Sequence, residues 1–238
     1  MNTTTPTTSS PQQLTALSEA FFREGCAVIP HLLATEEVAA LRAKTDEFAR
    51  NPDPNSKHTS YAAGTTFVLR HCHEADPLFA QLITRPAVVQ IAEAVLGPQA
   101  KFNAMNVIRN EPGQAISRWH VDDVLEFPLP PDIPRFDARI RMPVLWFTIQ
   151  VALSDIDDEA HGPTQYVPYS HYSGRKPPAE LLFEGHGPQS IYCKAGDAYL
   201  TNHQTWHRGA PNTSDRTRYV LQIQFAQHWA DRRFRGVA

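Results

Sequence analysis

A histidine and an aspartate stand two residues apart in the stretch Trp119-His120-Val121-Asp122-Asp123. On an extended chain, successive side chains point to opposite faces, so His120 and Asp122 would share one face. One metal ion could then take an imidazole nitrogen from His120 and a carboxylate oxygen from Asp122. The spacing alone is a weak signal, because a His-x-Asp tripeptide arises easily by chance.

A third candidate ligand lies far downstream, at His207. Together with His120 and Asp122 it gives two imidazoles and one carboxylate. This set leaves coordination positions open and suits non-haem Fe(II). Two arginines, Arg216 and Arg218, follow shortly after His207. The sequence therefore predicts a reaction class, iron-dependent redox chemistry, before it gives any indication of the substrate.

The composition describes an ordinary globular chain. With 238 residues, of which 42% are hydrophobic, the chain can bury a sizeable core in one domain. A formal net charge of −3 argues against a general nucleic-acid or membrane-surface binder. The 3 cysteines are few and scattered, which is typical of a reducing compartment. With no apolar run of transmembrane length, we expect a soluble, cytoplasmic protein whose partner is a small molecule.

The order of elements along the chain predicts the architecture. Residues 1–11 are rich in Thr, Ser and Pro and are expected to form a disordered leader. Residues 12–238 are expected to form a single domain. Its helices cluster in a buttress over about 12–98, and seven or eight strands form a core over about 99–228. This pattern predicts a mainly β protein with N-terminal helices, in which two sheets make a barrel.

Residues 144–153 form the most strand-like run in the chain. Its odd positions are all apolar: Leu145, Phe147, Ile149, Val151 and Leu153. Its even positions include Trp146, Thr148 and Gln150, which are amphipathic or polar. In a closed β structure this second face either meets solvent or lines an internal cavity. Trp146 favours the cavity.

Three features leave two interpretations each. The Pro-rich segment 124–143 is either a lid over the candidate ligands or a plain surface loop. Its arginines, Arg135, Arg139 and Arg141, either attract an anionic substrate or are solvated, and the second is the more common case. His171 is either a ligand or a hydrogen-bonded structural histidine, and again the second is favoured.

Several motifs, taken in order, resemble one family. They are His120-Val121-Asp122, the run Gly162-Pro163-Thr164-Gln165-Tyr166-Val167-Pro168-Tyr169-Ser170-His171, Gly196-Asp197, His207, the run Pro211-Asn212-Thr213-Ser214, and Arg218. The ordered set, with the opening segment 21–30, resembles the phytanoyl-CoA dioxygenase family. The resemblance implies a double-stranded β-helix (a jelly-roll, cupin-like core) and dependence on Fe(II), 2-oxoglutarate and O2.

The resemblance also implies roles for single residues. His120, Asp122 and His207 match the iron ligands of the family. Arg218 stands 11 residues after His207 (218 − 207), where the family places the arginine that holds the distal carboxylate of 2-oxoglutarate. Arg216 stands two positions too early.

The chain also departs from the family pattern. Gly209 replaces a residue that often carries a hydroxyl and helps to bind the co-substrate. Thr148 or Gln150 is expected to supply that contact instead, and Trp146 is expected to contact the co-substrate as well.

The implied reaction is oxidation of an unactivated C–H bond of a small-molecule substrate, with release of succinate and CO2. The carboxylate of Asp122 favours hydroxylation or a related oxidation, because halogenating relatives lack this ligand. Two alternatives stay open, a Zn(II)-dependent hydrolase on the same ligands and a barrel that only binds metal or ligand. A homodimer and a substrate from specialised metabolism are compatible with the sequence.

Overall fold

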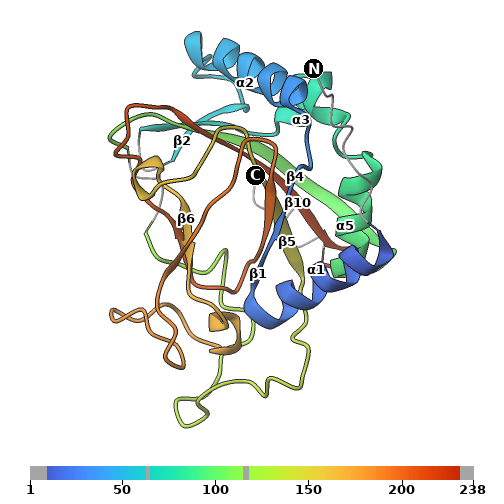
Figure 1. Ribbon diagram of the computed structural model, residues 1–238, viewed down its shortest axis with the longest axis vertical. Coiled ribbons are helices and arrows are strands. Elements are labelled where there is room, and N and C mark those ends of the chain that lie inside the picture. Colours follow the sequence, from blue (N-terminus) through green and yellow to red (C-terminus); the bar gives the residue numbers. More distant parts are fainter. Residues whose placement is uncertain (1–9, 63–64, 115–117, 231–238) are drawn as a thin grey trace.

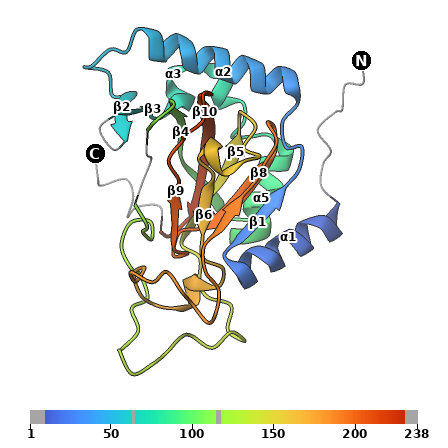
Figure 2. The ribbon, with the colours of Figure 1, turned by 60° about the vertical axis from the view of Figure 1, so that its left-hand side comes forward.

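The computed structural model describes residues 10–62, 65–114 and 118–230, which form two antiparallel sheets with helices packed outside (Figures 1 and 2). The seven-stranded sheet has the order β1 (Cys26–Ile29), β8 (Ala198–Asn202), β5 (Trp146–Ala152), β10 (Arg218–Gln227), β4 (Ala100–Asn110), β3 (Thr66–Leu69) and β2 (Thr59–Ala62). The three-stranded sheet has the order β7 (Gln189–Ile191), β6 (Thr164–Tyr166) and β9 (His207–Gly209). Within the described ranges, no helix combines the length and apolar character that crossing a bilayer requires.

The helices precede the jelly-roll strands. They are α1 (Pro11–Glu24), α2 (Thr35–Arg50), α3 (Cys72–Ala75), α4 (Pro77–Ala80) and α5 (Pro86–Leu96), and two short 3-10 turns, η1 (Glu159–His161) and η2 (Ser170–Tyr172), follow later. Ser10 and Gln13 form a capping box at the start of α1. Gly25 ends the helix in the left-handed conformation, with φ +82°. The chain then turns directly into β1, an edge strand of the large sheet.

The apolar core lies between the large sheet and the helices. The odd residues of β5 and β10 pair across the strands on this side, as in Ile149 opposite Ile223 and Phe147 opposite Phe225. The even residues face the small sheet, where Gln150 is opposite Gln222 and Thr148 is opposite Gln224. Alternation in the two central strands therefore separates an oily face from a polar face, and the polar face lines a cavity.

The architecture confirms the predicted fold class, with β4 to β10 as the strands of the core. The N-terminal part supplies more than helices, because β1, β2 and β3 extend the large sheet. Residues 1–9 of the predicted leader lie outside the described residues, whereas Pro11 already belongs to α1. Helix α4 ends at Ala80, and hydrogen-bonded turns follow over 81–84.

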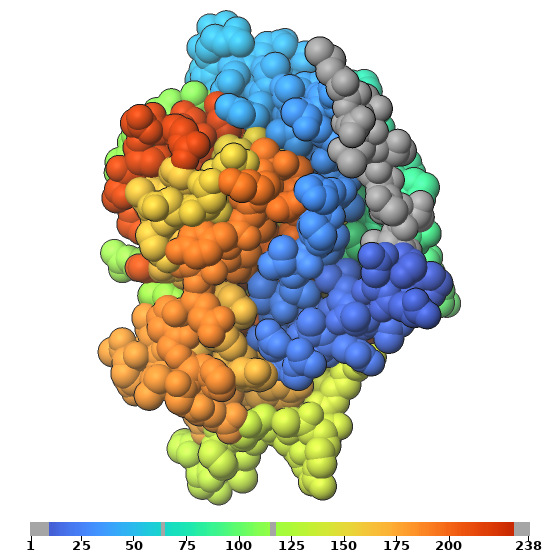
Figure 3. Space-filling model, viewed as in Figure 1, coloured from blue at the N-terminus to red at the C-terminus, as the bar shows by residue number. Residues whose placement is uncertain are grey.

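The segment 124–143 contains no helix or strand, as its prolines predict. It forms the lower end of the molecule, drawn in yellow-green beside the orange chain of the 170–190 region (Figure 3). The guanidinium of Arg175 holds it in place by donating to the carbonyls of Pro130 at 3.0 Å, Ile133 at 2.6 Å and Pro134 at 2.9 Å. These bonds make the segment a packed wall of the molecule.

Candidate metal centre

The backbone brings the three predicted ligands together. His120 and His207 form an isolated antiparallel bridge, in which each N–H donates to the other's carbonyl at 3.0 Å. The N–H of Asp122 donates to the carbonyl of His203 at 2.8 Å. As a result, Asp122 Oδ1 lies 3.3 Å from Nε2 of His120 and 3.5 Å from Nε2 of His207. One ligand atom from each residue lies within 4.8 Å of the other two, so a single cation can bind all three.

Each imidazole is oriented through its second nitrogen. Nδ1 of His120 lies 2.7 Å from the carbonyl oxygen of Arg118, and Nδ1 of His207 lies 2.8 Å from that of Thr205. A carbonyl can only accept, so each Nδ1 carries the proton and each Nε2 keeps its lone pair. This is the arrangement that fixes the tautomer of a metal-binding histidine.

The electrostatics of the site favour a bound cation. Burial raises the pKa of the Asp122 carboxyl, but the neighbouring His207 and His120 imidazoles outweigh burial and hold this pKa well below its usual range. Burial lowers the pKa of His207, but Asp122 outweighs it and the net direction is upward. The ionised carboxylate therefore attracts positive charge to the space between the two rings.

The ligands lie at the wall of a cavity of about 240 Å³. Thr148 and Gln150 line this cavity, as predicted from the alternation of β5. Sequence reasoning assigned no role to the other polar residues that line it, which are Thr164 on β6 and Gln222 and Gln224 on β10. The even positions of β10 could have indicated the two glutamines, because they share the face of Arg218.

Arg218 reaches the same cavity from the start of β10 and is only 4% exposed. Its Nη2 donates to Thr164 Oγ1 at 3.3 Å, while Nε and Nη1 are buried without a hydrogen-bond partner. Burial lowers the pKa of this guanidinium by more than the neighbouring Tyr199 and Cys193 raise it. A buried arginine with unused donors is costly unless an anion completes it.

Arg216 lies elsewhere, at the surface of the β9–β10 connection. Its side chain is 56% exposed, and its Nη2 lies 3.7 Å from Asp157 Oδ1 and also contacts His161. Solvent and these neighbours satisfy its charge. The structure therefore separates the two arginines, although alternation gives positions 216 and 218 the same parity and cannot distinguish them.

Trp146 occupies a different position from Thr148 and Gln150. It lies on the same side of β5 but is not among the described residues that line the cavity. Its ring stacks on His203, with centroids 5.1 Å apart and planes at 27°. His203 Nε2 in turn lies 2.7 Å from Glu126 Oε2, and both side chains are almost fully buried. Trp146 therefore packs against His203, whose carbonyl accepts from the N–H of Asp122.

The remaining candidates lie away from the cavity. His171 is buried, its Nε2 lies 3.0 Å from the carbonyl oxygen of Phe22, and burial lowers its pKa to about 4, so it is a structural histidine. Arg135 pairs with Glu184, Arg139 pairs with Asp137, and Arg141 lies over the ring of Phe22. None of these three arginines is among the described residues that line the metal cavity.

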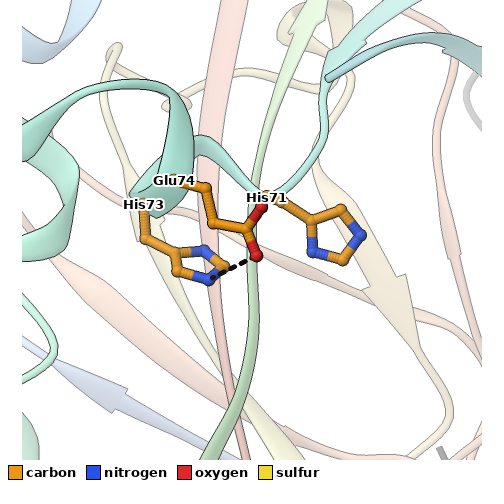
Figure 4. Close-up of side chains that lie close together, drawn as sticks. All are labelled: His71, His73 and Glu74. Atoms are coloured by element: carbon orange, nitrogen blue, oxygen red, sulfur yellow. Dashed lines mark ion pairs between the residues drawn. The ribbon is translucent and has the colours of Figure 1, made fainter. Parts of the chain in front are cut away.

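A second group of potential ligands lies on and beside α3. His71, His73 and Glu74 lie close together, with the carboxylate between the two rings (Figure 4). Lys57 already pairs with this carboxylate, and Glu74 is 43% exposed. Because a lysine pairs with the one acid in this group, His120, Asp122 and His207 are the stronger candidate metal site.

Relatives of known activity share part of this sequence. An L-proline trans-4-hydroxylase of Streptomyces griseoviridis is 27% identical over 160 residues, which are 64% of this chain and 53% of that protein. An ectoine dioxygenase of Bordetella parapertussis is 24% identical over 168 residues, which are 64% of this chain and 48% of that protein. The matched region thus spans about half the length of these two relatives.

Solved structures share the fold. The epimerase SnoN, in complex with Fe3+, alpha ketoglutarate and nogalamycin RO, superimposes with a TM-score of 0.72 at 20% identity, over 92% of this chain and 85% of that one. HygX from Streptomyces hygroscopicus, with nickel, 2-oxoglutarate and hygromycin B bound, gives a TM-score of 0.69 at 16% identity, over 93% and 88%.

The family match covers most of the chain. The profile described as Phytanoyl-CoA dioxygenase (PhyH) matches residues 21–220, which include the three clustered ligands and Arg218. The chain therefore belongs to the phytanoyl-CoA dioxygenase family of Fe(II)/2-oxoglutarate-dependent oxygenases.

Proposed function

We propose that this chain hydroxylates an unactivated C–H bond of a small molecule, using O2 and 2-oxoglutarate and releasing succinate and CO2. In this proposal His120, Asp122 and His207 hold Fe(II), and Arg218 binds the distal carboxylate of 2-oxoglutarate. The bound iron and co-substrate supply the oxidising chemistry, while the protein positions the reactants and excludes water.

One observation carries the proposal. Two imidazoles and a carboxylate suited to Fe(II) border the same cavity as a buried guanidinium whose Nε and Nη1 have no partner. A dicarboxylate that chelates the metal at one end and binds Arg218 at the other end fills open metal positions and pairs with the buried guanidinium. Guanidinium suits this task because its planar fork matches a carboxylate and stays charged.

Thr164 supports Arg218 in this role. It is opposite Gly209 in the β6–β9 pair, at the position where the family often carries a hydroxyl. Its Oγ1 lies 2.8 Å from the hydroxyl of Tyr199, which donates to Gln150 Oε1 at 3.3 Å. We infer that Thr164 supplies from the neighbouring strand the hydroxyl that Gly209 lacks. Thr148 is the second candidate donor, because Gln150 is already engaged at both ends.

The reaction type follows from Asp122 and from the named relatives. A carboxylate ligand leaves no position for halide, which favours hydroxylation. The hydroxylase and the dioxygenase reported above support this choice, whereas SnoN is an epimerase of the same fold. A zinc hydrolase that used the same metal ligands would give the buried charge of Arg218 no anionic partner.

The test is oxygen consumption coupled to succinate formation in the presence of Fe(II). Wild type should consume 2-oxoglutarate slowly even without substrate, and His207→Ala should lose this turnover while keeping its circular dichroism spectrum. His31→Ala, at a side chain 80% exposed, is the matched control. Full turnover in His207→Ala would remove the proposal, and hydrolysis that is supported by Zn(II) without oxygen uptake would favour the hydrolase.

A further inference from the structure

Two glutamines of β10 face the cavity with unused hydrogen-bonding groups. Gln222 and Gln224 are half-buried and line the cavity opposite Gln150 and Thr148. Gln150 is satisfied by Thr201 and Tyr199, at 3.1 and 3.3 Å. Within residues 10–62, 65–114 and 118–230, by contrast, neither Gln222 nor Gln224 makes a side-chain hydrogen bond. Each therefore offers one carbonyl acceptor and two N–H donors to a ligand.

Once Fe(II) and 2-oxoglutarate are bound, the cavity offers a substrate no unbalanced charge. The charges of Fe(II) and Arg218 balance the carboxylate of Asp122 and the two carboxylates of 2-oxoglutarate. The other lining side chains that point inward are uncharged, namely those of Ala62, Ile108, Thr148, Gln150, Thr164, Gln222 and Gln224. A charged substrate group would be desolvated there without a counter-charge, which is strongly unfavourable.

Arg208 does not change this balance, although it contributes to the cavity wall. Alternation in β9 turns its side chain to the face opposite His207. Its Nε donates to Gln165 Oε1 at 2.7 Å, and its guanidinium lies over the Trp119 ring, 5.3 Å from the centroid. The arginine is thus engaged on the outer face of the small sheet.

Resting on the function proposed above, we propose that Gln222 and Gln224 form a substrate subsite that selects neutral molecules carrying hydroxyl or amide groups. Amide side chains recognise such groups by paired donor and acceptor contacts without any charge. At about 240 Å³ the cavity is smaller than a pocket for a drug-sized ligand, so only a compact part of the substrate enters it with 2-oxoglutarate. Acyl-CoA thioesters and free carboxylates are the wrong class for this site.

The test uses binding without turnover. Protein loaded with Ni(II) and 2-oxoglutarate is titrated with N-acetylproline amide and N-acetylproline, which differ in one charge, and with methyl glucoside and octanoyl-CoA. Ligand-observed NMR gives the affinity for each probe. We expect the amide or the glucoside to bind, and we expect N-acetylproline and octanoyl-CoA to bind at least tenfold more weakly than the better neutral probe.

Variants identify the residues responsible. Gln222→Leu and Gln224→Leu should each lower the affinity for the neutral probes about tenfold, as expected for loss of one or two hydrogen bonds. The affinity for 2-oxoglutarate should stay within about threefold, because Arg218 carries that contact. Gln227→Leu, on the same strand but not among the described lining residues, is the control and should leave both affinities unchanged.

Three results would overturn the subsite. They are stronger binding of an anionic probe, absence of binding by both neutral probes, or a tenfold loss of 2-oxoglutarate affinity in Gln222→Leu, which would assign that residue to the co-substrate. Substrate-free 2-oxoglutarate turnover, measured separately, reports on the proposed function. It can therefore succeed while the subsite fails, so the two failures are distinguishable.

Discussion

His120 and His207 hold each other in place through their backbones, with two N–H···O=C bonds of 3.0 Å between them. Two residues distant in sequence are thus paired directly opposite each other, and both imidazole rings project toward Asp122. Because these bonds involve no side-chain atom, one of the candidate metal-binding side chains can be truncated without removing the backbone bridge that positions the others.

Gly25 connects this bridge to α1. A Cβ at Gly25 would lie 2.2 Å from Thr205 Oγ1 and 2.7 Å from His171 Nδ1, and the carbonyl of Thr205 orients His207. We expect Gly25→Ala to lose about 2–4 kcal/mol of unfolding free energy, from backbone strain plus overpacking. Its affinity for metal should also fall, which a metal titration measures.

Gly185→Ala is the matched control for that change. Gly185 lies in the turn between Phe183 and His186 and has a similar φ of +83°, but a Cβ there meets no atom within 4 Å. Only the backbone strain of about 1–2 kcal/mol should appear, with metal affinity unchanged. Equal losses in the two variants would show that the contact with Thr205 has no influence on the site.

Arg218 and Arg216 should differ strongly in their effect on 2-oxoglutarate. Losing a buried charge-assisted contact in Arg218→Ala should cost about 2–5 kcal/mol, which raises the apparent Michaelis constant about 30-fold to several thousand-fold. Arg216→Ala should stay within a few-fold of wild type, because its side chain is 56% exposed. Steady-state titration with 2-oxoglutarate decides, and the reverse ranking would contradict the assignment of Arg218.

The same arginine should reduce the stability of the ligand-free protein. Arg218→Met removes a buried charge whose Nε and Nη1 are unpaired, so it should raise the free energy of unfolding by about 1–3 kcal/mol. Adding 2-oxoglutarate to the metal-loaded protein should stabilise wild type more than the variant. Urea unfolding with and without ligand measures both effects. A less stable Arg218→Met would mean that the guanidinium is satisfied without ligand.

His171 should make the protein sensitive to mild acid. Burial lowers its pKa to about 4, below the value of about 6.5 of an exposed histidine. As the pH falls through this window, the unfolded chain takes up a proton that the folded state refuses. The stability that is fully present above pH 6.5 is therefore lost, by up to about 3 kcal/mol near pH 4.

Comparing unfolding free energies at pH 7 and pH 4.5 tests this effect. The difference between the two pH values should shrink in His171→Gln, whereas His31→Gln, at an exposed side chain, should keep the wild-type difference. An unchanged difference in His171→Gln would assign the acid sensitivity to other groups.

The sequence alone predicted the local geometry of the site and missed its non-local contacts. Alternation placed Thr148 and Gln150 on the cavity side of β5, because strand period is a local property, and the spacing from His207 favoured Arg218 over Arg216. Thr164 received no role, since its position beside Arg218 depends on the β6–β9 pairing, which joins distant segments. Trp146 shares the cavity side of β5 but stacks on His203, so its contact with the co-substrate stays a prediction.

The place of β10 in the large sheet has a consequence for biosynthesis. β10 lies between β5 and β4, yet among the described strands it is the last to leave the ribosome. Until residue 227 has emerged, β4 and β5 each present an unpaired edge, and Arg218 has not joined the ligands. The large sheet and the candidate metal centre are therefore completed together, once β10 has emerged, and the exposed edges of the nascent chain are sites where chaperones would act.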